Sequence, residues 1–178
     1  MTHRKRTALL FPGQGKGSVF PGMGKKLLKS PGAREIFFEM GKALDMDVLS
    51  LCVYASEEAL RRTDHSQIAS LATSLGHMML LRERETKALD DPETITAGNS
   101  IGELAAGVFS GAVRLEDSFH IVRARGTAMH QACLEHPSKM LVGLNREPIH
   151  IEEVEKICKG SDGVTVTNYN SATQIVIG

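Results

Sequence analysis

The stretch "AGNSIGELAAGVFSGA" (residues 97–112) sets a serine between two glycines in the pattern G-x-S-x-G, from Gly98 to Gly102. The "ETITAG" before the serine has the composition of a short strand, and the small and apolar residues after it are typical of a helix that packs closely on a sheet. A serine held on such a strand-to-helix turn is typical of an enzyme nucleophile. The alternative is a glycine-rich turn in which Ser100 only caps the helix.

The segment "TALLFPGQG" (residues 7–15) predicts another buried strand, which runs into a glycine-rich loop. Neither G-x-x-x-x-G-K-[ST] nor G-x-G-x-x-G fits this loop, which excludes the common phosphate-binding loops. Gln14 is placed to donate a backbone N–H toward an oxyanion, together with the N–H of Ile101, which follows the candidate nucleophile. A plain turn is the alternative interpretation.

Apolar residues recur with helical spacing in three further segments. The first begins at Ser30-Pro31, the second covers residues 66–84, and the third covers residues from about 117 to 136. Arg125 borders the apolar side of the last segment. Its stem could simply lie across an apolar edge. Its planar guanidinium could instead bind a carboxylate through two parallel hydrogen bonds. The residues alone leave both interpretations open.

The pattern of the chain changes after residue 137. Residues 138–178 predict a strand at "MLVGL", a helix at "IEEVEKICK" and strands at "VTVTNYN" and "TQIVIG". This β-α-β-β order is the first part of a βαββαβ ferredoxin-like unit. We therefore expect two subdomains, residues 1–137 and 138–178, and an apolar strand at an open edge of the second sheet.

The composition excludes several functional classes. The chain has 178 residues, enough for a core, and its 21 Lys and Arg balance its 21 Asp and Glu, which disfavours nucleic acid or a membrane surface as a partner. No apolar run suits a membrane helix or a secretory signal. Three cysteines without a C-x-x-C pair favour a reducing compartment, and we expect them to be buried thiols: Cys52, Cys133 and Cys158.

Several motifs together resemble one enzyme family. "LLFPGQG", "GMG", "AGNSIGELAAGVFSGAV", "RARGTAMHQA" and "NYNSATQIVIG" stand in the order seen in malonyl-CoA:acyl carrier protein transacylases and in the acyltransferase domains of fatty acid and polyketide synthases. The resemblance covers nearly the whole chain and is to the N-terminal portion of such an enzyme. It implies an α/β fold, with an α/β-hydrolase-like large subdomain and an incomplete ferredoxin-like small subdomain.

The resemblance also implies roles for individual residues. Ser100 matches the serine that malonyl-CoA acylates, and the N–H groups of Gln14 and Ile101 match the oxyanion hole. Arg125 matches the arginine that pairs with the malonyl carboxylate, which favours the carboxylate-binding interpretation of that residue.

Two weaker matches are Gln67, near the site in relatives, and Asn168, on a strand that borders the acyl and pantetheine channel. Asn99 stands where the family usually has histidine, and the loop after Gly15 is longer than usual. The family's general-base histidine follows later than Gly178, so we expect none of the seven histidines in this chain to be the base.

The expected function is transfer of a malonyl group from CoA, through an acyl-serine, to the phosphopantetheine thiol of acyl carrier protein. The alternatives are an acyl hydrolase on the same scaffold and a non-catalytic truncated binding protein. No metal or cofactor is expected. The expected partners are malonyl-CoA and acyl carrier protein, and a C-terminal portion or another subunit is a further candidate. The expected compartment is the cytoplasm, with the mitochondrial matrix as the alternative.

Overall fold

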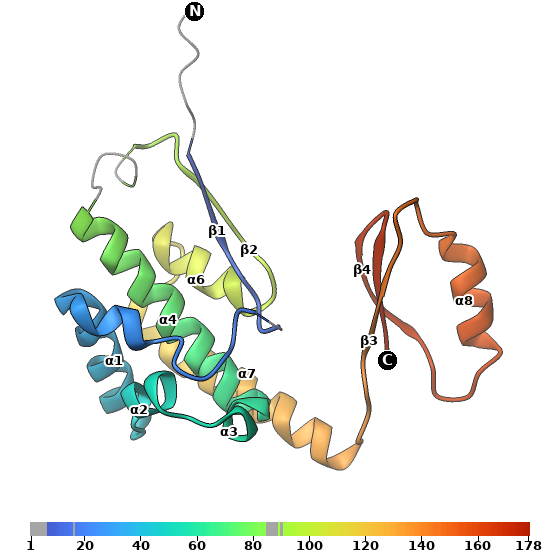
Figure 1. Ribbon diagram of the computed structural model, residues 1–178, viewed down its shortest axis with the longest axis horizontal. Coiled ribbons are helices and arrows are strands. Elements are labelled where there is room, and N and C mark those ends of the chain that lie inside the picture. The colour runs from blue at the N-terminus through green and yellow to red at the C-terminus, as the bar shows by residue number, and fades with distance from the viewer. Residues whose placement is uncertain (1–6, 16, 85–88, 90) are drawn as a thin grey trace, which may run out of the picture. The chain divides into compact units, whose positions relative to one another are not determined.

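Two short parallel strands carry the G-x-S-x-G turn. The computed structural model describes residues 7–15, 17–84, 89 and 91–178. β1 (Ala8–Phe11) pairs in parallel with β2 (Ile95–Gly98), so that Phe11 stands opposite Gly98. Parallel strands need a long crossover connection, and helices provide it here. The architecture is therefore α/β (Figure 1).

Two long helices dominate the crossover. α1 (Pro31–Leu44) and α4 (Thr63–Arg84) pack along each other. α1 begins where predicted, because the Ser30 hydroxyl accepts a hydrogen bond from the Ala33 N–H and a proline fills the first helical position. Three shorter helices that the sequence did not predict accompany them: η1 (Lys25–Lys29), α2 (Val48–Val53) and α3 (Glu57–Arg61).

The remaining helices of this part follow the serine. α6 (Ile101–Phe109) contacts both strands and α4, and α7 (Leu115–Glu135) follows after a short turn. Both were predicted, although α6 ends earlier than its apolar pattern. The large side chains with almost no exposed surface come from α1, α2, α4, α6, α7 and the η1 turn and form one core: Leu27, Phe37, Met40, Val48, Leu71, Leu75, Ile101, Phe119 and Val122.

The C-terminal residues form a second sheet. β3 (Leu141–Leu144), α8 (Ile151–Lys159), β4 (Val166–Ser171) and β5 (Gln174–Ile177) follow the predicted order. The strands lie in the order β3-β5-β4, with β5 antiparallel to both neighbours. β3 is an edge strand, and its Leu141, Val142 and Leu144 are exposed. The expected apolar edge strand is therefore present.

Contacts between residues divide the chain into two units, Met1–Gln131 and Ala132–Gly178. This division falls inside α7, whereas the sequence predicted it at residues 137 and 138. One cysteine prediction is wrong: Cys52 and Cys158 are buried, but Cys133 is exposed because it lies in the last turns of α7, where residues 131–135 are all exposed. Within the described ranges, no helix combines the length and apolarity needed to cross a bilayer.

Candidate active site

Ser100 occupies a strained backbone conformation between β2 and α6. Its φ of 55° and ψ of −116° lie outside the regions that residues with a Cβ ordinarily adopt. The residue is exposed, so the turn presents its hydroxyl at the surface. Strain of this kind persists only where the surrounding structure enforces it, and it is characteristic of the nucleophile elbow that the sequence predicted.

The two flanking glycines enforce the turn because no larger residue fits. A Cβ on Gly98 would collide with the backbone of Gly102, and a Cβ on Gly102 would collide with the carbonyl of Phe11. The end of β1, the end of β2 and the start of α6 thus approach one another closer than side chains allow. The glycines of G-x-S-x-G are therefore steric requirements of this elbow.

The first turn of α6 leaves one N–H free beside the serine. The N–H groups of Gly102 and Glu103 donate to the carbonyls of Asn99 and Ser100, at 2.9 and 3.1 Å. The Ile101 N–H has no acceptor among the described residues. A free N–H at a helix N-terminus favours a negative charge, since the helix dipole adds to it.

The loop after β1 runs directly beside the elbow. The Asn99 N–H donates to the Phe11 carbonyl at 3.1 Å. A Cβ on Gly13 would stand 2.9 Å from the Asn99 carbonyl oxygen and 3.4 Å from the Cβ of Ser100. The backbone N–H of Gln14, the next residue, likewise has no acceptor within the part of the chain described here. Two unused N–H groups therefore flank the serine.

Arg125 lies against the serine hydroxyl. Its Nη2 donates to the Ser100 Oγ at 3.0 Å, and its Nη1 donates to the Gln67 Oε1. Both acceptors are neutral, and no carboxylate among the described residues forms an ion pair with this guanidinium. Arg125 is thus a half-buried cation whose charge no described side chain balances.

A close helix approach brings Arg125 to this position. A Cβ on Gly126 would stand 3.0 Å from the Cα of Asp64, so α7 crosses the start of α4 nearly in backbone contact. Burial would raise the pKa of the Asp64 carboxyl, but a hydrogen bond from Arg62 and the charges of His65, Arg62 and His130 lower it overall. Asp64 therefore stays ionised at the crossing, paired with Arg62 at 2.7 Å.

Gln67 is fully buried and is hydrogen bonded at both ends of its amide. Its Nε2 donates to the Thr63 Oγ1 at 3.1 Å and to the Met129 Sδ at 3.2 Å. The Thr63 Oγ1 also accepts from the Gln14 Nε2 at 2.9 Å. The sequence carries no signal that places Thr63 or Met129 at the site, because only the packing of α4 against α7 and the first loop brings them there.

Five of the six predicted site residues therefore meet around Ser100: Gln14, Gln67, Ser100, Ile101 and Arg125. The sixth, Asn168, is an exposed residue of β4 in the second unit, paired with Val176 of β5.

In the described part of the chain, no histidine side chain is hydrogen bonded to Ser100. His65 Nδ1 contacts the Ala59 carbonyl and His77 Nδ1 contacts the Thr73 carbonyl, and no described histidine hydrogen bonds to Ser100. His3 lies outside the described residues. Among the described residues, no group of three or more His, Cys, Asp or Glu side chains is arranged to hold a metal ion.

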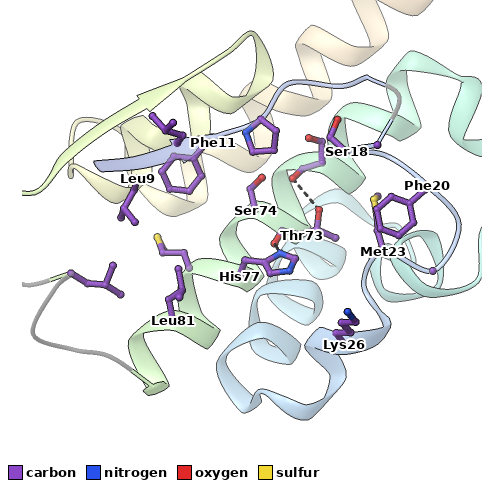
Figure 2. Close-up of a pocket in the computed structure, with 17 residues that line it drawn as sticks. Leu9, Phe11, Ser18, Phe20, Met23, Lys26, Thr73, Ser74, His77 and Leu81 are labelled. Carbon is purple, nitrogen blue, oxygen red and sulfur yellow. Dashed lines mark hydrogen bonds between the residues drawn. The ribbon is translucent and has the colours of Figure 1, made fainter. Parts of the chain in front are cut away.

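A separate pocket lies between β1 and α4 (Figure 2). Its volume is ≈ 530 Å³, and Figure 2 shows the rings of Phe11, Phe20 and His77 around it, together with Met23 and Leu81. None of the six predicted site residues lines this pocket. The polar groups gathered around Ser100 thus form a site distinct from this apolar cavity.

An α/β unit with a strained serine on a strand–turn–helix elbow, beside unused N–H groups, has the architecture of enzymes that form acyl-serine intermediates. Comparison with known proteins narrows this class. The chain belongs to the acyl transferase domain family, whose model matches residues 9–178.

Named relatives support the family assignment. The chain is 37% identical over 141 residues to a probable mitochondrial malonyl-CoA-acyl carrier protein transacylase of Drosophila melanogaster, covering 79% of this chain and 36% of the fly protein. It is 34% identical over 174 residues to the malonyl CoA-acyl carrier protein transacylase of Bacillus subtilis, covering 97% of this chain and 53% of that protein.

A solved structure agrees with these relatives. The crystal structure of MCAT from Mycobacterium tuberculosis superposes with a TM-score of 0.83 at 32% identity and covers 97% of this chain and 55% of that one. The chain thus spans about half the length, or less, of the proteins that it matches.

Proposed function

We propose that this chain supplies the nucleophile and the acid-binding arginine of a malonyl-CoA:acyl carrier protein transacylase. The observation that carries the proposal is the 3.0 Å contact between Arg125 Nη2 and Ser100 Oγ. A malonyl group esterified to Ser100 ends in a carboxylate that lies within reach of this guanidinium. Arginine binds carboxylates through paired hydrogen bonds, so a cation at this position selects an acyl group that ends in an acid.

The proposed reaction has two steps. In the first, Ser100 Oγ attacks the thioester carbonyl and loses its proton to a general base, the C–S bond breaks, and CoA leaves as the thiol after taking a proton. In the second, the pantetheine thiol of the carrier attacks the ester, the C–O bond breaks, and Ser100 regains its proton. The N–H groups of Gln14 and Ile101 stabilise the oxyanion in both steps.

The general base in this proposal is a histidine of the enzyme's C-terminal portion and none of the seven histidines of this chain. Arg125 cannot accept a proton from Ser100, since arginine stays protonated in proteins. A serine ester needs no metal or bound cofactor, so we propose none beyond malonyl-CoA as substrate and the phosphopantetheine of the acceptor. We propose a cytoplasmic location. The mitochondrial matrix is the alternative, because the fly relative is named as a mitochondrial protein.

We also propose a more specific description of the fold of each subdomain. Residues 1–137 form the first part of an α/β-hydrolase-like subdomain, and residues 138–178 the first part of a ferredoxin-like subdomain. The second description is supported by the order β3-β5-β4, in which β5 lies between two strands that α8 connects. In this proposal Asn168 borders the acyl and pantetheine channel, and its exposed amide provides hydrogen bonds there.

The proposal is tested by the intact mass of the chain after incubation with malonyl-CoA, alone and with the C-terminal half of the Bacillus subtilis relative as a source of base. We expect one malonyl adduct, mapped to the peptide with Ser100 and absent in Ser100→Ala. Addition of carrier protein with free phosphopantetheine should remove the adduct and form malonyl-carrier. Absence of an adduct under both conditions would overturn the proposal, and release of free malonate alone would favour the hydrolase.

Arg125→Ala tests acyl selection. Loss of a charge-assisted pair should lower malonyl loading by about 10- to 100-fold, and acetyl loading much less. Arg123→Ala is the matched control, because Arg123 lies on the same helix but donates to the Leu44 carbonyl. Equal losses of malonyl and acetyl loading in Arg125→Ala would contradict the assignment.

A further inference from the structure

The side chains around Ser100 form a hydrogen-bond network with two branches, and both branches end at the Thr63 hydroxyl. One branch runs from Ser100 through Arg125 to Gln67, and Gln67 donates to the Thr63 Oγ1. The other branch is the amide of Gln14, which donates to the same oxygen. The Thr63 hydroxyl therefore hydrogen bonds both to Gln14, in the loop beside the elbow, and to Gln67, the partner of the arginine.

The Thr63 hydroxyl fixes the orientation of the Gln67 amide. Gln67 has no exposed surface, so bulk water does not reach its amide. Its oxygen must face Arg125, because a guanidinium only donates hydrogen bonds. Its NH2 group must then find acceptors on the other side, where Thr63 Oγ1 and the weak acceptor Met129 Sδ stand at 3.1 and 3.2 Å. Without the hydroxyl, the amide keeps only the sulfur.

The same hydroxyl anchors the first loop. Gln14 Nε2 donates to Thr63 Oγ1 at 2.9 Å, and Thr63 Oγ1 is 3.3 Å from Gln14 Oε1. The side chain of Gln14 thus points to Thr63, while its backbone follows Gly13, which lies against Asn99 and Ser100. Holding the side chain restrains the backbone N–H that flanks the serine.

We propose that Thr63 is a positioning residue. Its hydroxyl holds the Gln67 amide so that Oε1 faces Arg125, and it holds the Gln14 loop against the elbow. Among the described residues, this hydroxyl has no hydrogen bond to a backbone N–H of its own helix or to Ser100. The effect on acyl loading rests on the proposed function, whereas the effect on the arginine does not.

Three variants separate this role from a structural one. Thr63→Val keeps the branched shape and removes the hydroxyl, and Thr63→Ser restores it. Thr73→Val is the matched control, because Thr73 is buried on the same helix and donates only to the Ala69 and Ser70 carbonyls. We expect Thr63→Val to lower malonyl loading about tenfold and to lower the malonyl-to-acetyl ratio, with Thr63→Ser and Thr73→Val near wild type.

A second measurement needs no catalysis. Phenylglyoxal modifies arginines, and peptide mapping reports the rate at Arg125. A guanidinium released from Gln67 should react several-fold faster in Thr63→Val than in wild type, Thr63→Ser or Thr73→Val. If wild type forms no malonyl adduct but Arg125 responds in this way, the proposed function fails and the positioning role stands. If Arg125 reacts at the same rate in Thr63→Val, or equally faster in Thr73→Val, the positioning role is wrong.

Discussion

Gly102 shows at the scale of a single residue how the sequence imposes the elbow. A Cβ at this position would collide with the Phe11 carbonyl. Gly102→Ala must push β1 and α6 apart, and we expect it to lower the free energy of unfolding by about 3 kcal/mol, measured by urea denaturation. Gly15→Ala is the control, since a Cβ there would meet nothing within 4 Å. A similar loss in both variants would contradict the steric argument.

Cys52 provides a pH-dependent prediction. Burial raises the pKa of its thiol from the usual 9.0 to about 12. Above pH 9 the unfolded chain ionises this thiol and the folded chain does not, so its contribution to stability is complete below pH 9 and is lost as the pH rises toward 12. We expect wild type to lose about 1 kcal/mol per pH unit more than Cys52→Ala over this range.

Urea denaturation at several pH values between 8 and about 10.5 checks this slope, within the interval that the raised pKa defines. The matched control is Cys133→Ala, because Cys133 is exposed. It should retain the wild-type slope. A Cys52→Ala variant with that same slope would show that the Cys52 thiol ionises equally in both states.

The residues of the site differ in how far sequence predicts them. Ser100 and its glycines form a local pattern, and the steric demand that the pattern expresses is local too. Thr63 and Met129 have no such signal, because their contacts depend on how α4, α7 and the first loop pack together. Cys133 was predicted wrongly for a related reason: its type favours burial, but no described residue buries the last turns of α7, where residues 131–135 are all exposed.

At the scale of elements, α1 begins at a buried cap that links it to another helix. The Ser30 hydroxyl accepts from the Ala33 N–H at 3.1 Å and donates to Glu83 of α4 at 2.8 Å. We expect Ser30→Ala to cost about 2 kcal/mol in the free energy of unfolding, because it removes a cap and an interhelical bond. Ser56, the cap of α3, bonds only to the Ala59 N–H, and Ser56→Ala should cost about 1 kcal/mol or less.

Thermal and urea unfolding of the two variants measure this difference. Equal losses would mean that the bond to Glu83 contributes nothing.

The long helices could be predicted from the sequence, and the short ones could not. α1 and α4 repeat their apolar pattern over several turns, whereas η1, α2 and α3 are too short to show a period.

At the scale of the whole molecule, exposed apolar strands should govern behaviour in solution. Leu141 and Leu144 of the edge strand β3 are 68% and 72% exposed. Unpaired edges with apolar side chains promote association. We expect the wild-type chain to form concentration-dependent oligomers, and Leu141→Lys with Leu144→Lys to reduce them, as measured by sedimentation velocity.

The control for this prediction is Leu134→Lys, since Leu134 is a similarly exposed leucine on α7 and not on a strand. It should leave association unchanged. If all three leucines have equal effects, general surface hydrophobicity and not the strand edge drives association. If none has an effect, β3 is not the contact.

The positive charge of Arg125, which no described side chain balances, affects the choice of purification buffer. Its described partners are the neutral oxygens of Gln67 and Ser100, so the guanidinium is open to any small anion that reaches it. Citrate, succinate and malonate buffers all carry the carboxylates that arginine prefers. A carboxylate bound to Arg125 from such a buffer would lie beside the Ser100 hydroxyl, whereas a buffer without an anionic group, such as Tris, offers the guanidinium no such partner.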